Sequence, residues 1–298
     1  MKTIATLDGV SVEFLQRPGL EKSTRRSYES ALMPLLQEYG QTSIEIMTRQ
    51  TLQDYLSELP NLVYTTHQRH QATIQALFNF AVEQGYLKAN PIARLKRRKP
   101  DREKGEHGTD DVIRYLTPEQ LKVLYQVVTS NLRMNALVHL LHRTGARIAE
   151  VLALDLEIMN LDQRKFQVVG KGNKRRWCFY SDDAARVLER YLKYGRHSGC
   201  SALFTAQQPF TLDVSRMSYR TTHQDWTDLI AQRPELEGIR MHDLRHTFAT
   251  ERVGLMGIEE LRALMGHQNI QTTLRYQKVT SQRAETVAQS ALAALAKS

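Results

Sequence analysis

Residues 242–250 read His-Asp-Leu-Arg-His-Thr-Phe-Ala-Thr, and this stretch decides the fold of the second half of the chain. His242 and Arg245 are three residues apart, so they share one face of a predicted helix, while Leu244 and Phe248 share another face. The apolar pair anchors the helix in a core. The polar pair presents an imidazole beside a planar guanidinium, a combination that suits the binding of an anion.

The same helix has two other interpretations. A His-xx-Arg pair taken alone is more often an exposed polar face. His242 and His246 stand four residues apart, as zinc ligands on a helix do, but Asp243 occupies the position at which the zinc-protease motif has glutamate. We therefore expect no metal site and no cofactor.

A second stretch, residues 144–150, reads TGARIAE. Gly145 ends one predicted helix and Arg147 starts the next, at a helix N-terminus where free backbone amides and the helix dipole favour an anion. Glu150, one turn later, is placed to hold Arg147. An ordinary corner between two helices with a surface ion pair would have the same pattern.

A third stretch, residues 170–176, reads GKGNKRR and forms the tip of a hairpin that the apolar patterns of residues 166–169 and 177–180 predict. It lacks the residue order of a P-loop, so we expect no nucleotide hydrolysis. Lys171 can attract a phosphate and also donate a proton, which the very high pKa of arginine prevents. Beyond residue 182 we expect helices and loops only.

A fourth stretch, residues 264–276, reads LMGHQNIQTTLRY. Gly266 ends a predicted helix, and a short helix after Asn269 carries Tyr276. A phenol that attacks phosphorus needs an acceptor for its proton and cations that stabilise the phosphorane. Taken alone, Tyr276 has the pattern of a half-buried packing residue.

The composition indicates a soluble, globular protein with a polyanionic partner. The chain has 298 residues, of which 41% are hydrophobic, and no apolar run approaches the ~18 residues of a membrane span. A formal charge of +9 favours nucleic acid, although a merely basic soluble protein would have the same balance. Two isolated cysteines, Cys178 and Cys200, and a first segment without a secretion-signal pattern favour a cytoplasmic location.

A basic segment bounded by prolines separates two predicted domains. Apolar stripes predict a small helical bundle over residues 1–96, including a helix that starts at a Ser23 cap and kinks at Pro34. Residues 97–113 form the predicted linker, and residues 114–298 a mainly α domain with a small β-hairpin or sheet, an α+β fold. The basic residues expected to meet DNA phosphates, or simply to face water, are Arg25, Arg26, Arg69, His70, Arg94, Lys96, Arg97, Arg98, Lys174 and Arg175.

Together the four stretches resemble the tyrosine recombinase (phage integrase) family and, in size and layout, its Xer-type enzymes of bacteria. The resemblance covers roughly residues 117–276, with the family's order of arginine, lysine, His-xx-Arg, Gly-His and tyrosine intact. The N-terminal bundle resembles the family's core-binding domain only in length, helicity and position.

The resemblance implies a site-specific DNA recombinase that works without metal or nucleotide. In this family a tyrosine attacks the scissile phosphate, forms a 3′-phosphotyrosine and frees a 5′-hydroxyl that later attacks the partner duplex. The resemblance also implies a two-domain, C-shaped clamp on double-stranded DNA that is a dimer on one site and a tetramer in the synaptic complex. The residues that it implies are Arg147 and Arg245 as phosphate clamps, Lys171 (or Lys174) as general acid, His242 as proton acceptor or donor, His267 as a hydrogen-bond donor and Tyr276 as nucleophile.

Two other classes of function stay open on the sequence alone. A DNA-binding protein without catalysis would need the basic charge, but it would not need the complete set of arginines, lysine, histidines and tyrosine in the four stretches. A metallohydrolase would use His242, His246 and a carboxylate.

The segment after Tyr276 generates a prediction about assembly. Its apolar stripe comprises Val287, Ala288, Ala291, Leu292 and Leu295. A short terminal helix gains little by folding alone, so its stripe needs a groove, which in relatives belongs to the neighbouring protomer. Deleting residues 286–298 should spare the binding of a monomer to one site and weaken cooperative binding to paired sites. Gel-shift titration on one-site and two-site DNA measures both, and unchanged cooperativity would mean that the stripe packs on its own domain.

Overall fold

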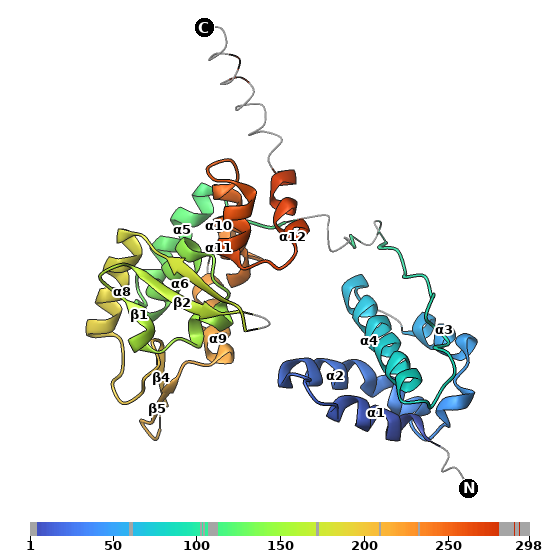
Figure 1. The fold of residues 1–298 in the computed structure, drawn as a ribbon. Helices are drawn as coiled ribbons and strands as arrows, with labels where there is room; N and C mark the ends of the chain where they lie inside the picture. Colours follow the sequence, from blue (N-terminus) through green and yellow to red (C-terminus); the bar gives the residue numbers. More distant parts are fainter. Residues whose placement is uncertain are drawn as a thin grey trace. The chain divides into compact units, whose positions relative to one another are not determined.

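The computed structural model describes residues 5–59, 62–101, 103, 105–106, 113–170, 173–208, 210–231, 233–279, 289 and 292. The chain divides into two compact units, Met1–Val112 and Ile113–Ser298 (Figure 1). In the part of the chain that is described, no helix has the length and apolar character to cross a membrane. Of the apolar stripe in the tail, the described residue is Leu292, which is exposed.

The first unit is a small bundle of α-helices, as its sequence pattern predicts. Its helices are α1 (Leu7–Gln16), α2 (Lys22–Tyr39), α3 (Arg49–Glu58) and α4 (Tyr64–Glu83), with a short 3-10 turn η1 (Ile44–Ile46). Their apolar stripes meet in one core, in which Phe14, Leu35 and Phe78 are fully buried. Thr48 caps α3 by accepting a hydrogen bond from the Thr51 amide at 3.1 Å.

Two expectations for this unit were wrong in detail. Helix α2 begins at Lys22, with Glu21 as its N-cap rather than Ser23. His70, which we expected on a polar face, is buried in the unit. Helix periodicity places a residue on a face, but whether a neighbouring helix covers that face depends on packing.

The second unit contains the longer run of helices and both sheets. Its α-helices are α5 (Pro118–Val128), α6 (Leu132–Thr144), α7 (Ile148–Leu152), α8 (Asp182–Tyr194), α9 (Tyr219–Ile230), α10 (Met241–Arg252), α11 (Ile258–Met265) and α12 (Ile270–Leu274), and its 3-10 turns are η2 (Leu156–Ile158), η3 (Pro234–Leu236) and η4 (Arg275–Val279). Thr117, directly before Pro118, caps α5 through a reciprocal pair of hydrogen bonds with Gln120. Helix α6 is buried along most of its length and packs against α8 and α10.

Two small antiparallel sheets complete the second unit. The predicted hairpin is confirmed as β2 (Lys165–Val169) and β3 (Arg175–Phe179), with Phe166 opposite Cys178, and β1 (Met159–Asn160) extends it to three strands. The expectation of only helices and loops beyond residue 182 was wrong, because β4 (Thr205–Gln207) pairs with β5 (Val214–Arg216). Tertiary bonds hold this second hairpin, since Arg216 donates to the carbonyl oxygens of Leu152 and Leu154.

A buried ion pair joins α7 to β3. The Arg176 guanidinium donates two hydrogen bonds to the Glu150 carboxylate, at 2.9 and 2.6 Å, and a third to the carbonyl oxygen of Leu264 at the end of α11. Burial would raise the pKa of Glu150, but the hydrogen bonds from Arg176 and Arg147 prevail and lower it to about 2. Both side chains are less than a tenth exposed, so each charge depends on the other.

We predict that Glu150→Gln lowers the free energy of unfolding by about 3 kcal/mol at neutral pH, because it leaves the buried Arg176 charge without its counter-ion. Since the folded pKa of Glu150 is below its ordinary 4.5, its contribution is present above pH 4.5 and is lost as pH falls toward about 2. The difference between wild type and variant should therefore shrink in acid. Denaturant unfolding at several pH values measures it, with the exposed Glu157→Gln as control; a difference that does not change with pH would contradict the ion-pair account.

Candidate active site

The turn between α6 and α7 builds one wall of the site. Gly145 ends α6 in the left-handed conformation, with φ of 62°, and a Cβ there would lie 2.4 Å from the ring of Phe248 on α10. Glycine therefore permits both the turn and the close approach of α10. The carbonyl oxygen of Gly145 accepts a hydrogen bond from Arg245, so the turn also positions a guanidinium.

Arg147 stands at the N-cap of α7, as predicted. Its backbone amide donates to Glu150 at 2.7 Å and its guanidinium donates to the same carboxylate at 2.9 Å. The side chain remains 38% exposed, so part of the guanidinium can still meet a ligand. Glu150 thus holds Arg147, and it also pairs with Arg176, whose contribution the sequence analysis did not recognise.

Arg245 is almost completely buried, and its guanidinium donates to the carbonyl oxygens of Gly145 and Met265. Burial, with the nearby charges of Arg147 and Arg176, lowers the pKa of Arg245 to about 10. Such crowding of like charges in a poorly solvated place is unfavourable unless an anion offsets it. Glu150 already offsets the charge of Arg176, so Arg147 and Arg245 form a site suited to a phosphate.

His267 follows the left-handed Gly266, which ends α11 with φ of 63°. Its Nδ1 lies 2.9 Å from the hydroxyl oxygen of Thr273 on α12. Burial and the charges of Arg245 and Arg147 lower the pKa of His267 to about 3, so the ring is neutral. When the Thr273 hydroxyl is the donor, the ring proton resides on Nε2, where it can be donated to a phosphate oxygen.

Tyr276 lies on η4, directly after α12, and is buried against Phe248, Leu261 and Met265. Its ring lies parallel to that of His267, with 6.3 Å between the ring centroids. Its hydroxyl is 2.8 Å from Nδ1 of His246. Burial raises the pKa of the phenol, and the nearby charges of Arg245 and Arg147 act in the opposite direction.

The two histidines of α10 have different surroundings. His242 is exposed, and desolvation together with the Arg245 charge lowers its pKa. The rings of His242 and His246 meet edge to face, with centroids 4.7 Å apart. We had considered His246 only as a metal ligand, yet it is the partner of Tyr276. His246 stands four residues after His242, one helical turn further on, so helix periodicity places the two rings side by side.

Arg147, His242, Arg245, His267 and Tyr276 share one neighbourhood, since the charges of Arg147 and Arg245 act on the pKa values of His242, His267 and Tyr276. Lys171 lies outside the described residues. Lys174 and Arg175, in the described part of the hairpin, are exposed. Within the described ranges no group of three or more His, Cys, Asp or Glu side chains has the arrangement of a metal site.

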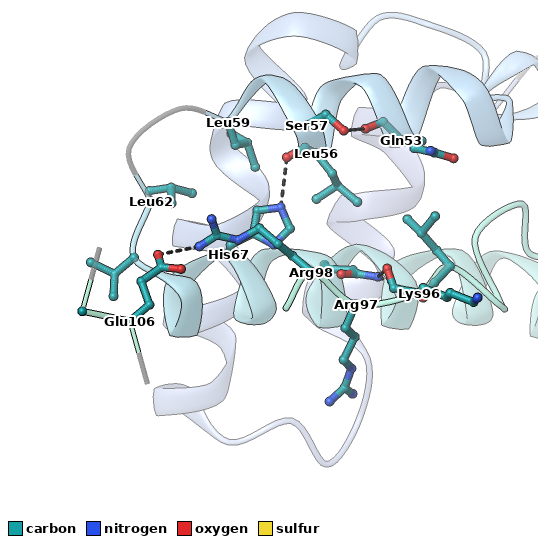
Figure 2. Close-up of a pocket in the computed structure, with 14 residues that line it drawn as sticks. Gln53, Leu56, Ser57, Leu59, Leu62, His67, Lys96, Arg97, Arg98 and Glu106 are labelled. Carbon is teal, nitrogen blue, oxygen red and sulfur yellow. Dashed lines mark hydrogen bonds and ion pairs between the residues drawn. The ribbon is translucent and has the colours of Figure 1, made fainter. Parts of the chain in front are cut away.

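The predicted DNA-binding residues of the first unit lie mostly on its surface. Arg26, Arg69, Arg94, Lys96 and Arg97 are exposed, whereas Arg25 is partly buried. Figure 2 shows Lys96, Arg97 and Arg98 beside a pocket of about 680 Å³, where His67 bonds to the carbonyl oxygen of Leu56. Arg98 pairs with Glu106 at 2.6 Å, so its charge is already offset.

Comparison with known proteins agrees with this geometry. Residues 114–283, more than half of the chain, match the Phage integrase family. Tyrosine recombinase XerD of Haemophilus influenzae is 28% identical over 95% of this chain and 96% of its own length, and XerC of Staphylococcus haemolyticus is 25% identical over 93% and 94%.

Solved structures share the fold. The Tn1549 transposon integrase in complex with transposon right end DNA has a TM-score of 0.73 at 17% identity, covering 95% of this chain and 99% of that chain. A lambda integrase dimer bound to a core site has a TM-score of 0.71 at 15% identity, covering 91% and 95%. The ordered motifs, the cationic site around Tyr276 and the match over residues 114–283 together show that this chain belongs to the phage integrase family.

Proposed function

We propose that this chain is a site-specific recombinase that breaks and rejoins DNA strands through a 3′-phosphotyrosine at Tyr276. The observation that carries the proposal is the gathering of the Arg147 and Arg245 guanidiniums around a phenol and three imidazoles. The XerD and XerC relatives are named tyrosine recombinases, and this chain matches almost their whole length. Their names support the same activity here. Non-catalytic binding and metal-dependent hydrolysis have no comparable support.

Each side chain has a role in the proposed reaction. Arg147 and Arg245 bind the nonbridging oxygens of the scissile phosphate and stabilise the charge of the phosphorane. His267 donates a hydrogen bond to the same phosphate, and His242 accepts or donates a proton there. Lys171 protonates the leaving 5′-oxygen. The bond energy is kept in the phosphotyrosine, so rejoining requires no nucleotide.

The first unit and the basic segment supply the remaining DNA contacts in this proposal. Exposed Arg26, Arg69, Arg94, Lys96 and Arg97 can neutralise phosphates, and each neutralised phosphate adds to the salt dependence of binding. The proposed domains are residues 1–96 and 114–298, with 97–113 as the linker, and each contributes contacts to the duplex. Arg98 contributes less, because Glu106 already neutralises it.

The active assembly is a homo-oligomer that works in the cytoplasm, with a dimer on one site and a tetramer at synapsis. Support for assembly comes from the lambda integrase structures, which include a tetramer bound to a Holliday junction. Arg147, His242, Arg245, His267 and Tyr276 all lie in one unit, which supports cleavage of one strand by each protomer. Exchange between duplexes then requires the protomers to be held together.

We predict that Tyr276→Phe abolishes the covalent link to DNA and leaves DNA affinity within about twofold, because it removes the attacking oxygen from an otherwise unchanged buried ring. The DNA site is first selected from randomised duplexes by covalent capture with the wild-type protein. The substrate is a nicked duplex that carries this site. A denaturing gel measures the adduct and a gel shift measures affinity. Covalent adducts in Tyr276→Phe would overturn the assignment of Tyr276 as the nucleophile. If EDTA abolished cleavage by the wild type and zinc restored it, the result would favour a metallohydrolase.

We predict that Lys171→Ala cleaves a duplex with sulfur at the 5′-bridging position far faster than ordinary DNA, because a thiolate leaves without being protonated. Relative to wild type, the variant should lose about 10²-fold or more on the oxygen substrate and little on the sulfur substrate. Lys174→Ala is the matched variant on the same hairpin. If the sulfur substrate instead rescues only Lys174→Ala, Lys174 is the general acid and Lys171 is not.

A further inference from the structure

His246 holds a position that the proposed roles leave unused. Its Nδ1 lies 2.8 Å from the Tyr276 hydroxyl oxygen, within hydrogen-bonding distance. The two rings are tilted by 46° with centroids 5.7 Å apart, so the contact joins the edge of the imidazole to the phenol oxygen. His242, one turn earlier, is exposed and meets the His246 ring instead.

The bond has a definite direction. Burial and the neighbouring His242, Arg240 and Arg245 keep the pKa of His246 near 4, with Asp243 acting in the opposite direction, so the ring is neutral at physiological pH. The phenol of Tyr276 is protonated there, because burial raises its pKa. Tyr276 therefore donates and Nδ1 of His246 accepts, which leaves the imidazole proton on Nε2.

We propose that His246 is a catalytic residue that takes the phenolic proton of Tyr276 as the tyrosine attacks. The inference rests on the proposed recombinase function. As the bond from the phenol oxygen to phosphorus forms, the phenolic proton moves to Nδ1 of His246. The bond from phosphorus to the 5′-oxygen breaks, and Lys171 gives that oxygen its proton. Rejoining reverses these transfers.

The charges around His246 make this transfer depend on DNA. In the free protein, Arg240 and Arg245 oppose a positive charge on the imidazole. A scissile phosphate bound between Arg147 and Arg245 places a negative charge among those cations, which favours protonation of His246. The phenol consequently stays protonated until a phosphate is in place, which restrains Tyr276 from reacting elsewhere.

The variant His246→Asn distinguishes a residue that only accepts a hydrogen bond from Tyr276 from one that also accepts its proton. The asparagine side-chain oxygen can occupy the place of Nδ1 and hold the phenol, but it takes no proton. His246→Asn should therefore bind DNA normally and cleave the captured nicked duplex about 10²-fold more slowly than wild type. His197→Asn, an exposed histidine in the loop after α8, is the matched control and should cleave at the wild-type rate.

The deciding readout is rescue by a more acidic phenol. A difluorotyrosine placed at position 276 ionises more readily, so it should restore most of the rate to His246→Asn and change wild type little. The rate of His246→Asn with ordinary tyrosine should also rise with pH more steeply than that of wild type. Wild-type cleavage by His246→Asn, or a loss that neither the acidic phenol nor higher pH relieves, would overturn the role of His246. Absence of any adduct with wild type would instead overturn the proposed function itself.

Discussion

The arrangement of the second unit depends on a buried carboxylate shared by two arginines. Glu150 accepts hydrogen bonds from Arg147 and Arg176, and Arg176 in turn donates to the carbonyl oxygen at the end of α11. These bonds tie the turn before α7, strand β3 and the end of α11 to one another. The same three segments carry Arg147, the basic hairpin and His267, so the geometry of the proposed phosphate site depends on this ion pair.

The cluster has more positive charge than Glu150 can offset. The lowered pKa of Arg245 records the cost of placing a third guanidinium beside Arg147 and Arg176 in a poorly solvated place. A phosphate monoanion between Arg147 and Arg245 would relieve that cost and, at the same time, lie where charge develops in the transition state. The protein fixes these cations before DNA arrives, so little reorganisation is needed during the reaction.

Most of the fold and the cationic residues could be predicted, because they depend on local chemistry. Gly145 and Gly266 end helices in left-handed conformations, Thr117 caps α5, and the β2–β3 hairpin follows apolar alternation. Features that arise from contacts distant in sequence were missed. The β4–β5 hairpin has three residues per strand and is held by Arg216, and His70 is covered by its own bundle. The contact between His246 and Tyr276 forms only because η4 brings the phenol to α10.

The central claim is that Tyr276 becomes covalently joined to DNA within this cationic site. The most direct measurement is mass spectrometry of the wild-type protein after reaction with the captured nicked duplex and digestion by nuclease and protease. The account predicts a nucleotide attached through its 3′-phosphate to the peptide that contains Tyr276. A nucleotide on any other residue, or a cleaved duplex with no protein adduct, would contradict it.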